Sequence, residues 1–431
     1  TKSLHNWKSS ANRKPLILKG ARQVGKTYIL KAFGNEAFAR CHYVNFEMDE
    51  RLGKIFEQDL KPQRILDELQ FYLDRSIDSH QDLVIFDEIQ RCPRALTSLK
   101  YFSEEMPDLA LCAAGSLLGV TLHTDTASFP VGKVQFLEMY PLSFDEFLDG
   151  IDKERLAELI RIHDLNQPVP AMAHEQLWDC WKRYLVVGGL PEAVNLYRER
   201  QENAYEAMQA VRKAQHDLMD AYLADIAKHS GKMNALHIER LWRNVPAQLA
   251  QAQNGSAGKF KLREGIPGIR GYERLAAPLG WLEAADLLIR VPIIDAIGIP
   301  LSGMIKENRF KLYFFDVGLL GAMSGIPPAT ILQYDFGSYQ GYFAENYVAQ
   351  ELRSAGCKTP FCWQGRTAEV EFLFEQAEGI VPVEVKSGWV TQSKSLKVYT
   401  DRYHPTKSYI LSAKNTNPTN ERHHLPLYLS S

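Results

Sequence analysis

The sequence predicts an α/β protein with an amino-terminal parallel sheet covered by helices, a helical middle part and a second α/β part at the carboxyl end. Short apolar runs alternate with helical patterns over roughly the first 148 residues, and charged helical patterns fill residues 149–230. Strand patterns return beyond about residue 298. Strands that alternate with helices are typical of a parallel sheet with helices on its faces.

The amino-terminal part contains four short apolar runs that we interpret as strands. They cover residues 16–20, 41–47, 82–88 and 109–116. Between them, residues 62–77 and 94–106 carry apolar side chains at helical spacing. This order predicts at least two helices that cover a parallel sheet.

Changes in sequence character predict four domains. Residues 1–148 form the parallel-sheet domain, 149–230 a helical lid, 231–297 a winged-helix-like domain and 298–431 the second α/β domain. The third assignment rests on the order of a helix, a basic turn-rich segment, a helix over 272–288 and a short apolar strand.

Composition excludes several classes of protein. The chain has 431 residues, 45% hydrophobic and 24% charged, with a net charge of -2. These values argue against disorder, collagen-like repeats and membrane embedding. No apolar run approaches the roughly 20 residues that span a bilayer, and the first residues lack the apolar core of a signal peptide. We therefore expect no membrane partner, a cytoplasmic protein and six reduced cysteines.

The segment KGARQVGKTYIL, residues 19–30, follows the first apolar strand and opens a helix. Its spacing of Gly20, Gly25, Lys26 and Thr27 satisfies the phosphate-loop pattern, in which backbone amides at a helix start bind phosphate groups. Lys26 would contact the β- and γ-phosphates, and the Thr27 hydroxyl would bind Mg²⁺. The pattern predicts a P-loop domain that uses ATP and Mg²⁺.

A second apolar strand supplies the acidic half of this site. Residues 83–86 lead into Asp87 and Glu88, so that Asp87 would hold the metal through its water shell and Glu88 would polarise the attacking water. The next strand ends at Ser116, which we interpret as a sensor of the γ-phosphate. The predicted site comprises Gly20, Ala21, Arg22, Gln23, Val24, Gly25, Lys26, Thr27, Asp87, Glu88 and Ser116.

The alternative is a glycine turn and an acidic strand end with no ligand. An arginine supplied by a neighbouring subunit often reaches the γ-phosphate in such ATPases. The sequence therefore leaves a homo-oligomer possible. Arg91 and Arg94 lie near the acidic motif, but ordinary surface arginines explain them better.

Several motifs together resemble a widespread prokaryotic family of AAA+-type ATPases fused to a carboxy-terminal domain of unknown function. They are GARQVGKT, LVIFDEIQ, AAGS, PLSFDEFL, YLVVGGLPE and FKLYFFDVGLL, in this order. The resemblance implies an AAA+ sheet of the ASCE type, in which a further strand separates the two nucleotide motifs. The family usually has an arginine after a glycine shortly before PLSF, whereas this chain has Gly132 and Lys133.

The carboxy-terminal part contains a second group of carboxylates. Strand alternation, with a hairpin around residues 376–379, would place Glu371 directly across from Glu384, with Lys386 on the same face. Facing like charges destabilise a sheet unless a cation such as Mg²⁺ compensates them. The pattern resembles restriction-endonuclease-like (PD-(D/E)xK) nucleases, and the resemblance implies that Glu345 is the helical acid of that site. This superfamily usually has aspartate where Glu371 lies.

Three interpretations of this group remain open. The carboxylates could cleave phosphodiesters, they could belong to an inactive nuclease fold that binds nucleic acid, or they could be exposed charges on an amphipathic hairpin. A basic segment, residues 255–274, would suit DNA phosphates or an ordinary surface equally well. It carries Lys259, Lys261, Arg263, Arg270 and Arg274 against Glu264 and Glu273.

Two functions follow. The first is an ATP-driven enzyme that acts on DNA through the winged helix and the nuclease-like domain. The second is a regulatory ATP switch whose carboxy-terminal module binds a protein or nucleic acid without cleavage.

Overall fold

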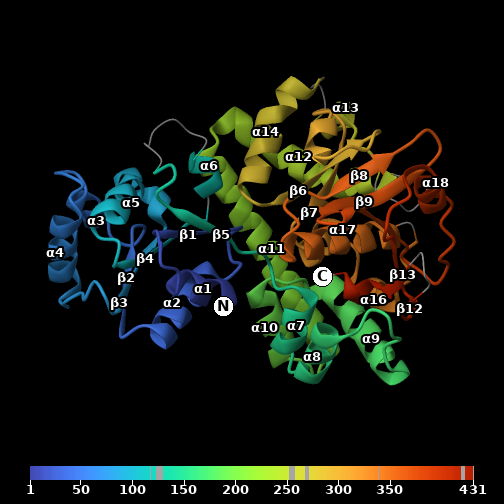
Figure 1. Cartoon of the computed structure of the whole chain (residues 1–431), viewed down its shortest axis with the longest axis horizontal. Helices are drawn as coiled ribbons and strands as arrows, with labels where there is room; N and C mark the ends of the chain where they lie inside the picture. The colour runs from blue at the N-terminus through green and yellow to red at the C-terminus, as the bar shows by residue number, and fades with distance from the viewer. Residues whose placement is uncertain are drawn as a thin grey trace. The chain divides into compact units, whose positions relative to one another are not determined.

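The computed structural model describes residues 1–116, 118–122, 130–251, 258–266, 271–337, 339–418 and 423–430 (Figure 1). The chain divides into two compact units, which are described separately. Unit 1 comprises residues 1–139 and 284–286, and unit 2 comprises residues 140–283 and 287–431.

Unit 1 contains a five-stranded sheet in which every strand pair is parallel. The strand order is β2-β3-β4-β1-β5, so β4 separates β1 from β3. The strands are β1 (Leu16–Lys19), β2 (Arg40–Asn45), β3 (Asp82–Asp87), β4 (Ala110–Ala114) and β5 (Gln135–Glu138). This arrangement confirms the predicted parallel sheet; β5 lies in a stretch for which the sequence predicted no strand.

Helices cover both faces of this sheet. One face packs Leu16, Leu18 and Ile85 against α1 and α2, and the other packs Ile17, Val84 and residues of α3 to α5. The helices are α1 (Lys2–Lys8), α2 (Lys26–Ala37), α3 (Arg51–Ile55), α4 (Pro62–Leu73), α5 (Pro93–Glu105) and α6 (Leu118–Leu122), with the 3₁₀ helix η1 (Ile89–Arg91). Alternate apolar side chains of each strand thus enter different cores, which requires both faces to be covered.

Unit 2 contains a mixed sheet of eight strands in the order β12-β13-β11-β10-β9-β8-β6-β7. The strands are β6 (Leu288–Ile294), β7 (Phe310–Phe314), β8 (Phe361–Gln364), β9 (Glu369–Gln376), β10 (Gly379–Val385), β11 (Tyr409–Ser412), β12 (Asn417–Pro418) and β13 (His423–Pro426). Pairing is parallel for β6-β8, β10-β11 and β11-β13, and antiparallel elsewhere. The predicted second α/β part is therefore present as a mixed sheet.

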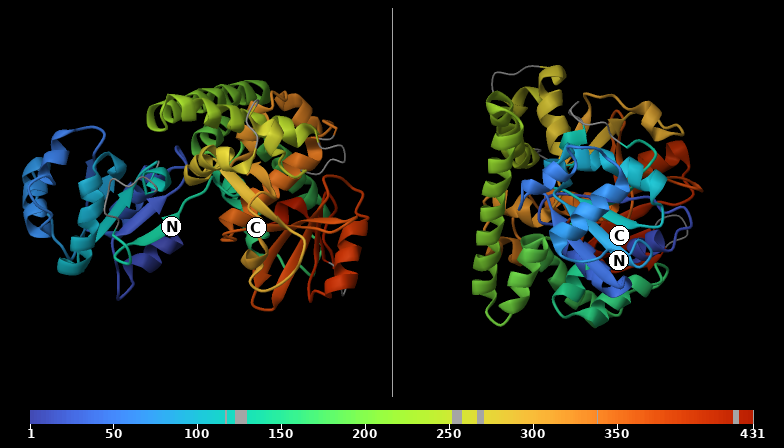
Figure 2. Two further views of the ribbon diagram at one scale, coloured as in Figure 1. Left: turned by 90° about the horizontal axis from the view of Figure 1, so that it is seen from above. Right: turned by 90° about the vertical axis from the view of Figure 1, so that its left-hand side faces the viewer.

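Helices of unit 2 precede and interrupt this sheet (Figure 1). The first group is α7 (Phe144–Gly150), α8 (Glu154–Ile162), α9 (Ala171–Val187), α10 (Pro191–Glu199), α11 (Ala204–His229), α12 (Lys232–Gln251), α13 (Leu262–Gly265) and α14 (Tyr272–Ala284). The second is α15 (Val317–Met323), α16 (Pro328–Gln333), α17 (Tyr339–Ser354) and α18 (Lys394–Tyr403), with η2 (Leu301–Met304) and η3 (Leu427–Leu429). Figure 2 shows α11 and α12 as long helices that lie against each other.

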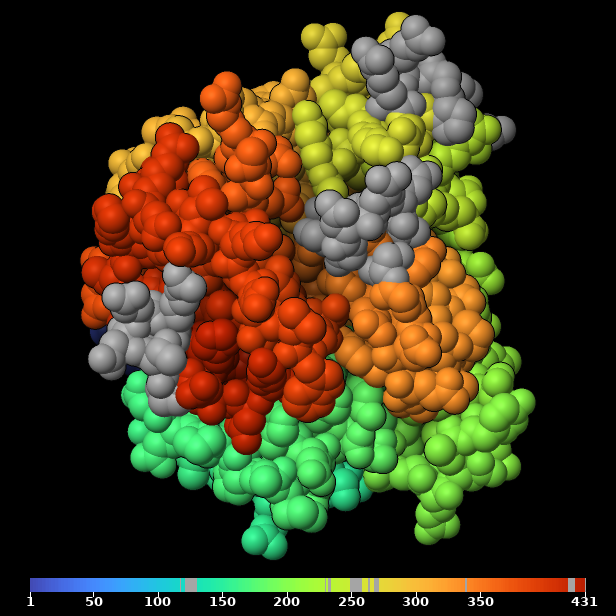
Figure 3. All heavy atoms as spheres, turned by 90° about the vertical axis from the view of Figure 1, so that its right-hand side faces the viewer, coloured from blue at the N-terminus to red at the C-terminus, as the bar shows by residue number. Residues whose placement is uncertain are grey.

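The helical segment after the PLSF motif packs against the carboxy-terminal strands. Asn415 exchanges two hydrogen bonds with the backbone of Val169, at 2.9 and 2.7 Å, and His174 Nδ1 lies 2.7 Å from the Tyr428 hydroxyl. Figure 3 shows this face, with the green residues of this segment beside the red residues of the carboxy-terminal part. The predicted lid and the second α/β part therefore share one compact unit.

The strand at residues 288–294 also differs from its expected assignment. It was grouped with the winged helix, but β6 pairs with β7 on one side and with β8 on the other, within the eight-stranded sheet. Residues 255–257 and 267–270 of the basic segment, including Arg270, lie outside the described residues, as does the side chain of Arg263. The winged helix itself stays a prediction. Among the described residues, no helix is both long and apolar enough to cross a membrane.

Candidate functional site

The predicted nucleotide site lies at the carboxyl edge of the five-stranded sheet. Gly20 follows β1, Asp87 ends β3 and Ser116 follows β4. Because these strands are parallel, their carboxyl ends meet at one edge, which is where open α/β sheets bind ligands.

The backbone of residues 20–25 requires glycine at two positions. A Cβ on Gly20 would lie 2.1 Å from the carbonyl oxygen of Met139, and Gly20 has a φ of +145°. Gly25 has a φ of 97° at the start of α2, and Gln23 is also left-handed at 62°. Val24 is buried beneath the loop. Such a loop can direct several amides toward an anion at the helix start.

The side chain of Lys26 folds over this loop. Its ammonium donates to the carbonyl oxygens of Gly20 at 2.9 Å and Ala21 at 2.7 Å. Burial is the largest effect and lowers the pKa of Lys26 to about 8. The charges of Glu88, Asp286 and Asp87 oppose this shift, and the charge of Arg22 adds to it. The nearby carboxylates favour a buried cation at the mouth of the loop.

Thr27 and Asp87 meet across the sheet edge. The Thr27 hydroxyl donates to Asp87 Oδ2 at 2.7 Å, and the Tyr43 hydroxyl donates to the same oxygen at 2.8 Å. Asn45 Nδ2 donates in turn to the Tyr43 hydroxyl at 2.9 Å. Burial is the largest cause that raises the pKa of Tyr43 to about 12, so its hydroxyl stays protonated and able to donate.

Glu88 begins η1 with an unusual backbone conformation. Its φ of 50° is left-handed, and its amide donates to Asp87 Oδ1 at 3.0 Å. Ser116 Oγ donates to Glu88 Oε2 at 3.2 Å, and Gln90 Nε2 donates to the same oxygen. A strained residue fixed by its neighbours is a feature of functional sites. Ser116 thus contacts the expected catalytic carboxylate.

Three residues of this site were not predicted from the sequence: Tyr43, Asn45 and Gln90. Tyr43 and Asn45 alternate along β2, which neighbours β3, so their spacing was an available signal once the strand order was known. The position of Gln90 also explains why residue 115 is glycine, because a Cβ on Gly115 would lie 2.0 Å from Gln90 Oε1.

The nearby basic residues have partners within unit 1. Arg91 pairs with Glu47 at 2.5 Å, Arg94 donates to the carbonyl oxygen of Phe56, and Lys133 pairs with Glu104 at 2.9 Å. These contacts agree with the interpretation of Arg91 and Arg94 as surface arginines.

The oxygen atoms of Thr27 and Asp87 suit Mg²⁺, which prefers hard oxygen ligands and usually combines one or two protein groups with substrate phosphates. The two oxygens lie 2.7 Å apart, close enough to serve one ion or its water shell. The residues therefore fit MgATP.

The carboxy-terminal carboxylates lie in unit 2. Strands β9 and β10 form the expected hairpin, in which Gln376 pairs with Gly379 and Phe372 with Val383. Glu371 and Glu384 are the next residues in this antiparallel register. Both are buried, with 4% and 2% of their surfaces exposed. They are therefore not exposed charges on an amphipathic hairpin.

Each carboxylate of this group has its own partner. Lys386 Nζ lies 2.6 Å from Glu384 Oε1, and the amide of Val385 donates to Glu371 Oε2 at 3.1 Å. Burial is the largest cause that raises the pKa of Glu371 well above its ordinary value, and the charges of Glu384 and Glu345 add to it. Glu384 Oε2 is buried and has no hydrogen-bond partner within the described part of the chain.

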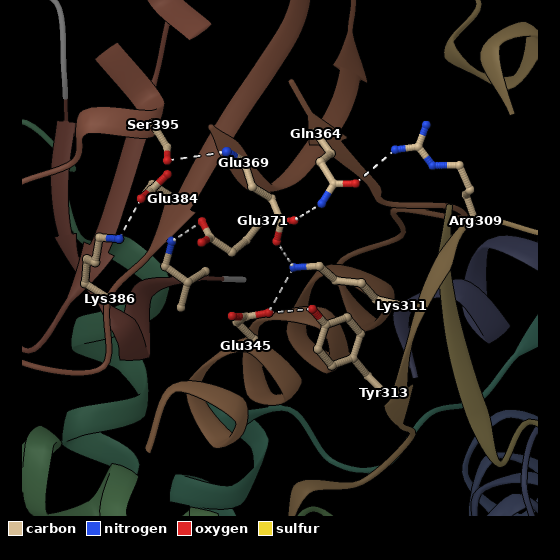
Figure 4. Close-up of polar contacts among 11 residues, drawn as sticks. Arg309, Lys311, Tyr313, Glu345, Gln364, Glu369, Glu371, Glu384, Lys386 and Ser395 are labelled. Atoms are coloured by element: carbon tan, nitrogen blue, oxygen red, sulfur yellow. Dashed lines mark hydrogen bonds and ion pairs between the residues drawn. The ribbon is translucent and has the colours of Figure 1, made fainter. Parts of the chain in front are cut away.

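Glu345 instead contacts two residues of β7. Tyr313 donates to its Oε2 atom at 2.6 Å, and Lys311 Nζ lies 3.5 Å from the same atom (Figure 4). Over the residues that the structure describes, no group of three or more His, Cys, Asp or Glu side chains could hold a metal ion. Within the described part of the chain, no shared metal site is thus seen for Glu345, Glu371 and Glu384, and their joint role stays a prediction.

Comparisons with known proteins agree with the amino-terminal site. Residues 12–148 match the family model described as an AAA domain. Residues 179–330 and 340–429 each match a domain of unknown function (DUF8612 and DUF4143). No curated protein matches the chain.

Solved structures with similar folds include three ATPase-type proteins. The Walker-type ATPase PABY2304 of Pyrococcus abyssi is 17% identical, with a TM-score of 0.48 over 75% of this chain and 94% of that one. The RuvB Holliday junction branch migration motor of Thermotoga maritima is 14% identical, with a TM-score of 0.34 over 68% and 88%. The ORC2 protein of Aeropyrum pernix is 14% identical, with a TM-score of 0.37 over 77% and 91%.

The family match covers the strands, the loop and the acidic residues of the site just described. The β-sheet is parallel, with β4 between the two strands that carry the nucleotide motifs. Residues 12–148 therefore form an AAA-type domain with the phosphate loop and parallel sheet of P-loop ATPases, which supports ATP binding and hydrolysis.

Proposed function

We propose that this chain is an ATP-driven protein that hydrolyses MgATP at the residues identified above and acts on DNA through unit 2. The observation that carries the first half is the 2.7 Å contact between Thr27 Oγ1 and Asp87 Oδ2. This contact places the start of α2 beside the end of β3. A metal-bound triphosphate would need residues from both elements at this point.

Each residue of the site then has a defined task. When bound, Mg²⁺ neutralises charge that develops on the phosphates. Thr27 and Asp87 would hold the ion, Lys26 and the amides of residues 20–27 would bind the phosphates, and Glu88 would orient the attacking water. Ser116 would position Glu88 through its hydrogen bond of 3.2 Å and would sense the γ-phosphate.

Nucleotide binding tests the loop directly. We expect Lys26→Ala to weaken ATP binding by at least about tenfold, because it removes the buried cation of the loop. Lys100→Ala, a surface change on α5, is the matched control. The measurement is a calorimetric titration with MgATP, and equal affinity of both variants would contradict the assignment of Lys26.

The proposal that unit 2 acts on DNA has two supports. Lys259 and Arg274 of the basic segment are exposed, and the Glu371, Glu384 and Lys386 pattern resembles that of the restriction-endonuclease-like proteins. The affinity of the protein for a DNA duplex should fall steeply between about 50 and 200 mM salt if contacts to the phosphates dominate binding. Salt-independent binding, or none, would contradict this part of the proposal.

The alternative function is a regulatory ATP switch whose carboxy-terminal module binds a protein or nucleic acid without cleavage. The carboxylate contacts favour it, because Glu384 pairs with Lys386 and Glu345 contacts Lys311 and Tyr313. Plasmid nicking with Mg²⁺ or Mn²⁺ separates the two functions. Nicking that Glu384→Ala abolishes would support a nuclease, and intact plasmid with either metal would support the switch. A homo-oligomer and a cytoplasmic location remain part of the proposal.

A further inference from the structure

A buried lysine lies among the carboxylates of unit 2, where a metal ion was expected. Lys311, the second residue of β7, has no exposed side-chain surface. Its Nζ atom lies 2.6 Å from Glu369 Oε1 and 3.5 Å from Glu345 Oε2. Figure 4 shows its ammonium between these two carboxylates, which come from β9 and α17.

A lysine this deeply buried needs compensating charge. Burial lowers the pKa of Lys311, but its neighbours Cys362, Glu345, Tyr313 and Glu369 together raise it to well above its ordinary value. Removing one partner of a buried ion pair leaves an uncompensated charge and is strongly destabilising. The stability of this buried cluster therefore requires Lys311 and its two carboxylates together.

Further hydrogen bonds fix both carboxylates around the ammonium. Gln364 Nε2 donates to Glu369 Oε2 at 2.9 Å, and Arg309 donates to Gln364 Oε1 at 2.9 Å. On the other side, Tyr313 donates to Glu345 Oε2. Each carboxylate is thus oriented toward Lys311 by a second donor, an arrangement that supports a fixed cation position.

We propose that the ammonium of Lys311 is the resident cation of the Glu345 and Glu369 carboxylates and takes the place that a divalent metal ion would occupy there. Glu345 is then not a metal ligand in this chain. The remaining carboxylates, Glu371 and Glu384, lie beside Lys386. The inference concerns the nuclease-like part of the proposed function and is independent of ATP hydrolysis.

Manganese binding to the nucleotide-free full chain tests this inference. The probe is Mn²⁺ alone, followed by electron paramagnetic resonance, with wild type compared with Lys311→Met. Methionine keeps an unbranched side chain of similar size but leaves the two carboxylates without a cation. We expect Lys311→Met to bind Mn²⁺ at least about tenfold more tightly than wild type does, because a nearby positive charge has been removed. Equal affinity of the two proteins would overturn the proposal.

Glu345→Gln is a second, nearly isosteric variant, and as a single substitution it tests the Mn²⁺ binding of wild type without requiring Lys311→Met to fold. We expect it to leave any Mn²⁺ binding of wild type unchanged and to abolish the tighter binding in the Lys311→Met background. Loss of wild-type Mn²⁺ binding in Glu345→Gln would show that Glu345 is a metal ligand and would overturn the proposal. ATP hydrolysis by each variant should match wild type, so a failed ATPase assignment would be recognised separately.

Discussion

The carboxylate of Glu351 on α17 accepts a hydrogen bond of 3.3 Å from the backbone amide of Phe144, 207 residues earlier in the chain. Two further contacts support this junction. The Tyr184 hydroxyl donates to the carbonyl oxygen of Leu142 at 2.5 Å and accepts a hydrogen bond from Gln350 at 2.6 Å. The PLSFDEFL and YLVVGGLPE motifs therefore meet α17, the helix that carries Glu345, in the interior of unit 2.

The FKLYFFDVGLL motif joins the same interior. Asp316, at its centre, accepts hydrogen bonds from the amides of Gly189 at 2.7 Å and Leu319 at 2.9 Å. A Cβ on Gly188 would lie 2.3 Å from Asp316 Oδ1. The paired glycines and the aspartate thus stabilise unit 2 by fitting one another closely.

The raised pKa of Glu351 predicts that the stability of the folded protein depends on pH. Burial is the largest cause that raises its pKa to about 8, although the amide of Phe144 lowers it. An unfolded glutamate has a pKa of about 4.3. The folded state therefore binds the proton more tightly, so this stabilisation is complete below about pH 4 and is lost as the pH rises through about 8. We expect the melting temperature of wild type to fall between pH 6 and 8.

Glu351→Gln should flatten this fall, because glutamine keeps an acceptor for Phe144 and cannot ionise. Scanning calorimetry at several pH values measures the slope. Asp316→Asn is the control: burial raises the pKa of Asp316 to about 6, so its contribution changes mainly below the tested range. An unchanged slope in Glu351→Gln would contradict the assignment.

Tyr43 predicts a positioning effect at the nucleotide site. Tyr43→Phe removes one of the two hydroxyl donors to Asp87 Oδ2, the one at 2.8 Å, and leaves the ring in place. Loss of such a partner of a metal-associated group typically costs about 10- to 100-fold in metal affinity or activity. We expect a higher Mg²⁺ requirement for ATP hydrolysis, measured by titrating Mg²⁺ at saturating ATP. Tyr101→Phe on α5 should behave as wild type; a normal Mg²⁺ titration for Tyr43→Phe would rule out this role.

The contact between Ser116 and Glu88 predicts that loss of the Ser116 hydroxyl slows ATP turnover with little loss of ATP binding. Ser116→Ala removes the hydrogen bond of 3.2 Å to Glu88 but no expected phosphate ligand of the loop. We expect kcat to fall about tenfold or more while the Kd for ATP changes less than about threefold. The matched control is Ser98→Ala, because Ser98 is also buried, lies on α5 and donates to the carbonyl oxygen of Ala95. A normal kcat in Ser116→Ala would remove Ser116 from the catalytic group.

The nucleotide site could be predicted largely from local sequence. Gly20, Gly25, Lys26 and Thr27 lie in one short loop, and Asp87 ends an apolar strand, so their chemistry follows from neighbouring residues. Tyr43 could not be placed in the same way, because its role depends on β2 lying beside β3. Strand order is set by tertiary packing, which sequence spacing does not record.

The carboxy-terminal cluster was harder to predict for the same reason. The hairpin register that aligns Glu371 with Glu384 follows from a two-residue turn, and the sequence indicated it. Lys311 was overlooked, although a lysine within the apolar strand FKLYFFD is unusual and was a signal of a buried ion pair. Its partners, Glu345 and Glu369, come from a helix and a strand more than thirty residues away, so only the folded structure joins them.

Hydrolysis by Glu88→Gln tests the central claim most directly. The variant keeps the size of the side chain but removes the carboxylate that would polarise water. We predict that it binds MgATP as wild type does and hydrolyses it about 10² to 10⁴ times more slowly in a single-turnover measurement. Turnover of bound ATP at the wild-type rate would contradict the account.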